Sequence, residues 1–161
     1  MAGASLQCRV DGLGMMDRAG IRLDRLVKFD FLGLHRDIGQ ALENSTLERF
    51  AKGEDPEGKP WKESGRVTAA NARRKPGERR PGGKTLQDTA RLKGSIHFEA
   101  EPDQVEVGTD VIYARIHQLG GETGRPGGRF EMPVRAFLGM SGDDDRLVET
   151  MYEDRIKERL L

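Results

Sequence analysis

The chain has 161 residues, which suits one compact domain with inserted loops or arms better than two domains. Hydrophobic residues make up 35% and charged residues 34%, so we expect a modest core and many residues on solvated faces or in loops. The 27 basic and 27 acidic residues cancel, which excludes a global field that would draw the protein onto nucleic acid or an anionic membrane.

The single cysteine, Cys8, excludes an internal disulfide. No apolar run approaches the roughly 20 residues of a membrane span, and no signal-peptide pattern is found. We therefore expect no membrane contact and synthesis in a reducing cytoplasm.

The beginning of the chain predicts one strand and two helices. Residues 5–10 alternate apolar and polar side chains, as in a half-buried strand. Apolar residues at three- and four-residue steps over 13–27 predict a helix that two glycines weaken. A second helix is predicted from an Asp30 cap to Gly53. Its stripe is Leu34, Ile38, Ala41, Leu42, Ser45 and Phe50.

The middle of the chain contains a basic insertion. Two prolines and a glycine break regular structure over 54–60, and Trp61 follows as an apolar anchor. Over 64–84, glycines and prolines separate basic residues, and large apolar side chains are almost absent. Because such a stretch cannot offset its ordering entropy by burial, we predict a flexible basic loop or arm. Its basic residues are Arg66, Arg73, Arg74, Lys75, Arg79, Arg80 and Lys84.

A short helix and a hairpin are predicted next. Leu86, Ala90 and Leu92 indicate the short helix. Residues 96–101 and 105–107 alternate apolar and polar side chains on either side of a turn signal, which predicts a β-hairpin. Its buried side chains are expected to be Ile96, Phe98, Val105 and Val107.

After the hairpin, Thr109 or Asp110 can cap a short helix that ends at two glycines. Residues 120–129 are rich in glycine, which predicts a flexible loop. The side of the helix that should face the hairpin consists of Ile112, Ile116 and Leu119.

The chain closes with an extended segment over 132–138 and a last helix that begins at Ser141. Three aspartates at 143–145 occupy the first turn, where the helix dipole favours acids. Together these elements predict one α+β domain over 1–161, with helices packed on a small, mostly antiparallel sheet and a long basic loop or arm. The stripe of the last helix is Val148, Tyr152, Ile156 and Leu160.

A phosphate-binding loop is not supported. Gly83-Lys84-Thr85 matches the end of the G-x-x-x-x-G-K-S/T pattern, but Glu78 stands where the first glycine belongs. Its carboxylate would repel phosphate, and no apolar strand precedes it. We therefore reject nucleotide hydrolysis.

Metal binding and other catalysis are not indicated either. The histidines His35, His97 and His117 are scattered and form no ligand pair with Cys8 or with each other. The aspartates at 143–145 are explained by the helix dipole, and no nucleophile motif is found. The sequence therefore predicts no catalytic residue, no metal site and no cofactor, and hence no enzyme.

The basic residues of the 66–84 segment leave two uses open. They could neutralise phosphates in a nonspecific, salt-sensitive way, which would make the protein a nucleic-acid-binding module. No aromatic residue is interleaved for base stacking. The use we favour is an arm that becomes ordered against a neighbouring subunit.

Two stretches carry motifs of mixed apolar, glycine and proline residues. The first joins the end of a helix to a proline-x-glycine-x-x-tryptophan element, which fixes a turn and places the tryptophan in an apolar pocket. The second is leucine-x-x-serine-isoleucine followed by a glycine in the next strand. The residues are Phe50, Pro56, Gly58 and Trp61 in the first stretch, and Leu92, Ser95, Ile96 and Gly108 in the second.

A third stretch joins tyrosine-alanine-x-isoleucine-histidine-glutamine, two glycines and proline-x-arginine-x-phenylalanine-leucine-glycine. We expect Tyr113, Ile116 and Leu119 to fix the short helix onto the hairpin, so most motif residues should be structural. The motif residues are Tyr113, Ile116, His117, Gly120, Gly121, Pro133, Arg135, Phe137 and Leu138.

These three stretches, in this order, resemble the virion morphogenesis (tail completion) family of tailed phages, over roughly residues 41–141. One departure is Ala90, which stands where the family often has glycine, so we expect the turn there to be helical. The resemblance implies a non-enzymatic protein of the virion neck or tail end. It would complete the tail or join it to the head.

The resemblance also implies partners and a location. We expect a ring of identical copies, made in the host bacterial cytoplasm, that contacts head connector, tail tube or tail terminator proteins and touches phage DNA nonspecifically. Contacts should map to the basic segment 66–84 and to the region 120–135. The further candidate contact residues are Arg125, Arg129 and Arg135.

Overall fold

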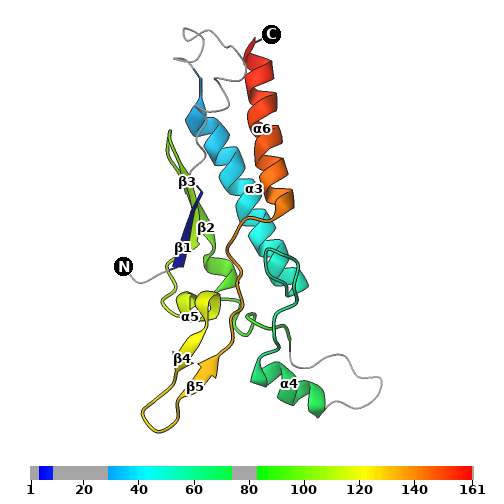
Figure 1. The fold of residues 1–161 in the computed structure, drawn as a ribbon, viewed down its shortest axis with the longest axis vertical. Helices are drawn as coiled ribbons and strands as arrows, with labels where there is room; N and C mark the ends of the chain where they lie inside the picture. Colours follow the sequence, from blue (N-terminus) through cyan, green and yellow to red (C-terminus); the bar gives the residue numbers. More distant parts are fainter. Residues whose placement is uncertain (1–3, 9–28, 74–82, 161) are drawn as a thin grey trace.

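The computed structural model describes residues 4–8, 29–73 and 83–160, and it confirms the predicted α+β class. The long helix α3 contacts a three-stranded antiparallel sheet and the C-terminal helix α6 (Figure 1). Helix α4 and a short hairpin lie at the end of the molecule opposite the C-terminus (Figure 1). The described α-helices are α3 (Phe31–Lys52), α4 (Gly65–Ala72), α5 (Ala114–Leu119) and α6 (Gly142–Leu160).

Helix α3 begins and ends where the sequence predicts. The Asp30 carboxylate accepts a hydrogen bond of 2.8 Å from the Gly33 amide, which satisfies a donor that the first turn leaves free. Gly53 ends the helix in the left-handed conformation, and its N–H donates to the Arg49 carbonyl. Its predicted stripe is confirmed at Leu34, Ile38, Leu42 and Phe50, which are all buried.

The main sheet has the strand order β1-β3-β2. The predicted hairpin is confirmed, because β2 and β3 pair antiparallel with Phe98 opposite Val107. The predicted first strand is also confirmed over the described residues 4–8, which pair with the other edge of β3. The strands are β1 (Ala4–Cys8), β2 (His97–Ala100) and β3 (Val105–Thr109).

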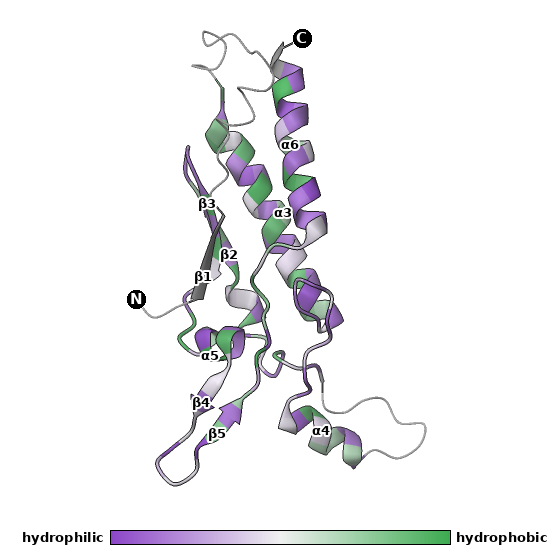
Figure 2. Ribbon diagram, viewed as in Figure 1, coloured by the Kyte–Doolittle hydropathy of each residue, from purple (hydrophilic) through white to green (hydrophobic). Residues whose placement is uncertain are grey.

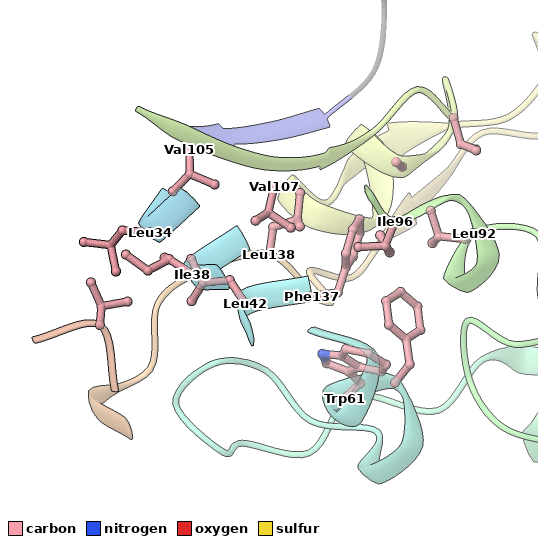
Figure 3. Close-up of a cluster of buried hydrophobic side chains, with 14 of the residues drawn as sticks. Leu34, Ile38, Leu42, Trp61, Leu92, Ile96, Val105, Val107, Phe137 and Leu138 are labelled. Atoms are coloured by element: carbon pink, nitrogen blue, oxygen red, sulfur yellow. The ribbon is translucent and has the colours of Figure 1, made fainter. Parts of the chain in front are cut away.

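The core lies between α3 and the sheet and continues toward the first motif. Figure 3 shows leucine and isoleucine side chains of α3 facing Val105 and Val107, with Trp61 and Phe137 gathered farther along. The Phe50 ring lies with its centroid 5.4 Å from that of Trp61 and 5.4 Å from that of Phe137. Trp61 Nε1 donates to the Ala136 carbonyl at 2.8 Å, so its one polar atom is satisfied.

Helix α6 packs on α3, and Figure 2 shows hydrophobic residues at intervals between hydrophilic ones along both helices. Ser141 caps it as predicted: its hydroxyl accepts from the Asp144 amide at 3.1 Å, and its own amide donates to the Asp144 carboxylate at 2.8 Å. Val148 and Tyr152 are buried, as predicted, and Ile156 is half-buried. The side chain of Leu160 lies outside the described residues.

The expected loop over 64–84 is wrong for its first part, which is α4. The Ser64 side chain caps this helix by accepting from the Val67 amide, and Val67 is buried. The described basic residues Arg66 and Arg73 are exposed, and the composition of the segment does not indicate the burial of Val67. Residues 74–82 lie outside the described residues, as do residues 9–28 with the helix expected over 13–27.

The short helix expected over 86–92 is also wrong. Leu86 and Ala90 have φ angles of 62° and 57°, which no right-handed helix accommodates. The Ala90 carbonyl accepts from the Gly94 amide, and a single 3-10 turn, η1 (Lys93–Ser95), follows. The turn at Ala90 is therefore left-handed, although the sequence has alanine there.

The glycine-rich stretch 120–129 is not a simple loop. Its beginning forms β4 (Gly121–Thr123), which pairs antiparallel with β5 (Phe130–Met132). Gly124, with a φ of 118°, allows the chain to turn between them. Residues 133–138 continue from β5 without pairing in a ladder, which agrees with the predicted extended segment.

Candidate interaction site

The second half of the third motif is held against the first half by one glutamine. The Gln118 Oε1 atom accepts from the amides of Phe137 and Leu138 at 3.0 and 3.1 Å, and its Nε2 donates to the Leu138 carbonyl at 2.8 Å. The Arg135 amide donates to the His117 carbonyl at 2.8 Å. The extended segment has no strand partner among the described residues, and these hydrogen bonds attach residues 135–138 to α5 instead.

Arg135 is a buried cation within this attached segment. Its side chain donates to the carbonyls of Lys62 at 2.7 Å and Glu63 at 3.3 Å, and it lies 3.2 Å from the Met132 sulfur. None of these acceptors carries a charge, and none of the described carboxylates forms an ion pair with Arg135. Burial lowers the pKa of the guanidinium, because the charged form is poorly solvated there.

His117 lies beside this cation. Burial, followed by the charge of Arg135, lowers the pKa of its imidazole, so the ring is neutral near pH 7. The Nδ1 atom is buried and has no hydrogen-bond partner among the described residues. The ring meets that of Tyr113 edge-on, with centroids 6.1 Å apart. Two unusual polar groups of the motif therefore lie together.

Arg135 and His117 line a hollow of about 370 Å³, which we call the basic hollow. Its walls come from the start of α4, the turns over 86–92 and the start of α5. Arg66 and Arg91 add to its positive charge, whereas its one acidic lining residue, Asp88, is largely exposed and pairs with Arg66 at 3.2 Å. A concave site with this charge attracts anionic groups.

Large apolar side chains are exposed beside the hollow. The expectation that Tyr113 and Leu119 fix α5 onto the hairpin is wrong, because Val111 and Ala114 are the buried residues of this turn. Of the predicted stripe, Ile112 and Leu119 are exposed, whereas Ile116 is half-buried. We call the following residues the apolar surface: Ile112, Tyr113 and Leu119 of α5 and its start, with Phe130 and Val134 of β5 and the residues after it.

The predicted basic contact residues are only partly brought together. Arg66 and Arg135 meet at the basic hollow. Lys84 donates to the Ala51 carbonyl, and Arg129 pairs with Glu122 at 3.4 Å, while Arg125 is exposed at the tip of the β4–β5 hairpin. Arg73 is exposed at the end of α4, and the remaining predicted residues, Arg74, Lys75, Arg79 and Arg80, lie outside the described residues.

Most of the other motif residues are placed in the core or at turns. The serine hydroxyl of the second motif, Ser95, lies 2.6 Å from that of Thr109, which ties η1 to the end of β3. Gly139 closes the third motif, and any side chain there would meet the Pro56 ring of the first. The buried members are Phe50, Pro56, Trp61, Leu92, Ile96, Gly108, Phe137 and Leu138.

The structure contains two buried networks of polar side chains that the sequence does not predict. Arg49 forms an ion pair with Asp144, and it donates to the carbonyls of Phe137 and Gly139 at 3.2 and 2.7 Å. His35 lies 2.6 Å from the Tyr152 hydroxyl and 2.7 Å from the Glu101 carbonyl. The sequence does contain one indication of their burial: Arg49 and His35 occur at helical spacing beside the apolar stripe of α3.

Neither a metal-binding cluster nor a membrane-spanning helix is found among the described residues. No group of three or more histidine, cysteine, aspartate or glutamate side chains among them could hold a metal ion. None of the described helices is long and apolar enough to cross a bilayer. The described residues thus form an α+β domain with motif residues at segment contacts, a basic hollow and exposed apolar side chains around α5.

Comparison with known proteins agrees with this organisation. A family model described as the phage virion morphogenesis family matches residues 18–157, which is most of the chain. The chain therefore belongs to the phage virion morphogenesis family, as its motifs indicate, and has a role in phage assembly.

One relative is the Mu-like prophage FluMu G protein 2 of Haemophilus influenzae. The two are 41% identical over 63 residues, which is 39% of this chain and 45% of the relative. The match thus spans less than half of the relative's length. No solved structure matches the chain.

Proposed function

We propose that this chain is a non-enzymatic structural subunit that completes the phage tail or joins the tail to the head, and that it works as an oligomer. The observation that carries the proposal is the apolar surface. Large apolar side chains left exposed are typical of protein contact sites, and here five of them occur on α5, its start, β5 and the residues after it. Ile112, just before the motif-bearing α5, is 75% exposed, and Leu119, at its end, is 63% exposed.

The hairpin beside this surface supports contact between copies. Among the described residues, strands β4 and β5 form a ladder only with each other, so their outer edges have no strand partner there. A ring of identical subunits uses two different faces of each copy, and a projecting hairpin suits one of them. The ring forms in the host bacterial cytoplasm and takes its place at the neck or tail end, against head connector, tail tube or tail terminator proteins.

Particle assembly tests this function directly. A phage in which the gene is deleted should accumulate heads and tails that electron microscopy shows to be unjoined or incomplete. The wild-type gene supplied in trans should restore intact particles. A gene carrying Ile112→Asp and Leu119→Asp should not restore them, whereas Glu158→Arg on the exposed side of α6 should. Normal particles in the absence of the gene would refute the proposal.

A further inference from the structure

The basic hollow contains two polar groups that the described residues do not fully satisfy. Arg135 is only 4% exposed and has neutral acceptors alone, and the buried His117 Nδ1 atom has none. A buried charge or polar atom without its counterpart is costly, so such groups are commonly matched by a ligand or a partner. The one carboxylate that lines the hollow, Asp88, is paired with Arg66, so Arg135 has no anionic partner among the described residues.

The walls of the hollow are held in a strained shape. Leu86 and Ala90, which both line it, have left-handed backbone conformations that are unfavourable for residues with a Cβ atom. Strain of this kind is commonly stored where a binding surface must have a fixed shape. The turns over 86–92 thus present Arg91 at the rim of a preformed cavity.

The lining favours a carboxylate of a protein over a phosphate of DNA. Leu86, Ala90, Leu92 and Tyr113 give the hollow apolar walls, and Tyr113 also belongs to the apolar surface. An apolar centre with few charges is typical of protein interfaces, whereas DNA backbone contacts require a row of exposed cations. A carboxylate suits arginine because its two oxygens can accept paired hydrogen bonds from one guanidinium.

The exposed side of α6 carries unmatched carboxylates. Asp145 and Glu149 are exposed, and neither side chain has a partner among the described residues. They stand four residues apart, so they lie on the same side of the helix. A second copy can therefore offer two adjacent acids, and because α6 and the hollow are different faces, repeated contacts of this kind link copies head to tail.

We infer that the basic hollow of one copy binds the Asp145 and Glu149 carboxylates on α6 of the next copy. This contact rests on the proposed oligomer and defines its polar part, beside the apolar surface. It gives the motif residues Arg135 and His117 a role at the interface, in addition to their backbone contacts within the chain.

A charge exchange in the full-length chain tests the contact. Arg91 lines the hollow but is exposed, so Arg91→Glu should leave the fold intact and weaken self-association by roughly tenfold in sedimentation equilibrium. Asp145→Arg with Glu149→Arg should weaken it similarly. Mixing the two variants should restore association between unlike copies. Lys59→Glu, on an exposed residue outside both the hollow and the apolar surface, is the matched control and should have little effect.

The outcomes separate this contact from the proposed function. If wild-type copies associate and neither charge variant weakens them, the contact is wrong while the oligomer stands. If both variants weaken association and their mixture does not recover, the pairing of these two faces is wrong. If the chain binds duplex DNA and Arg91→Glu abolishes only that binding, the hollow takes phosphate and the inference fails. A chain that never self-associates would contradict both proposals.

Discussion

At the scale of single residues, the backbone at Ala90 is costly. A residue with a Cβ atom in the left-handed region loses roughly 1–2 kcal/mol relative to its favoured conformations. Nothing in the alanine side chain offsets this loss, because it makes no hydrogen bond. This strained residue lines the basic hollow, and its backbone conformation determines where the next residue, Arg91, lies.

Ala90→Gly should stabilise the protein, because glycine adopts this φ without strain. The gain should be about 0.5–1 kcal/mol in urea unfolding, since the greater freedom of glycine in the unfolded chain removes part of the relief. Ala69→Gly on the exposed side of α4 is the control and should be destabilising by a similar amount. A loss of stability in Ala90→Gly would show that the left-handed turn is not maintained in solution.

The ion pair between Arg49 and Asp144 is the most consequential polar contact in the described core. Asp144→Asn should lower the free energy of unfolding by about 3 kcal/mol, because it leaves the Arg49 charge buried without its counterion. Asp145→Asn, next along α6 but exposed, should change stability by less than about 0.5 kcal/mol. Chemical denaturation of the two variants at pH 7 makes the comparison.

The same pair should make stability depend on pH. Burial alone would raise the pKa of Asp144, but hydrogen bonds from Ser45 and Ser141 and the charge of Arg49 lower it overall below its ordinary value of 3.8. The stabilisation is therefore complete above that ordinary value and is lost as the pH falls through the lower folded pKa. The difference in stability between wild type and Asp144→Asn should shrink below about pH 4. A difference that stays constant to pH 2 would contradict this assignment.

At the scale of elements, α3 organises the fold because it contacts both the sheet and α6. Its approach to β2 depends on Gly39, where a Cβ atom would overlap the Phe98 ring. The half-buried Phe98 therefore packs on the helix backbone itself. This contact fixes the distance between the helix and the sheet.

Gly39→Ala should be destabilising by about 1–2 kcal/mol, although alanine favours the helix, because the helix must move away from β2. Adding Phe98→Leu should recover part of the loss by removing the overlapping ring. Gly65→Ala, which has open space around it, should be neutral or slightly stabilising. Thermal unfolding of the four proteins tests the contact, and a neutral Gly39→Ala would refute it.

The sequence predicts those elements in which local signals and burial agree. Asp30, Gly53 and the period-2 runs of the β2–β3 hairpin specify their own structure, and each is confirmed. The signals fail where a distant contact decides the outcome. Residues 65–72 form a helix in which Val67 is buried. Around α5, Val111 and Ala114 are buried while Ile112 and Leu119 are exposed, and the spacing of apolar residues does not show which of these two sets faces the core.

The candidate site could be predicted only as a set of residue types. Arg135 and His117 were named from the motif, but their meeting with Arg66 and Arg91 depends on turns with left-handed alanine and leucine. Residue pattern does not indicate such turns. The Arg49–Asp144 pair joins residues far apart in the chain, so no local pattern predicts it.

At the scale of the whole molecule, the protein combines a folded body with surfaces that it does not bury itself. The core is continuous from α3 and the sheet to the Trp61 cluster, whereas the apolar surface and the basic hollow lie around α5. Net charge is zero, so the proposed association would depend on local complementarity between faces. This division suits the proposed role as a repeated subunit.

Sedimentation velocity of the full-length chain over a wide concentration range tests the central proposal most directly. We expect a closed oligomer that grows in population with concentration, and we expect Ile112→Asp with Leu119→Asp to be a folded monomer, because both side chains are exposed and contribute little to the core. A wild-type chain that stays monomeric at every concentration, alone and with phage connector or tail proteins, would contradict the account.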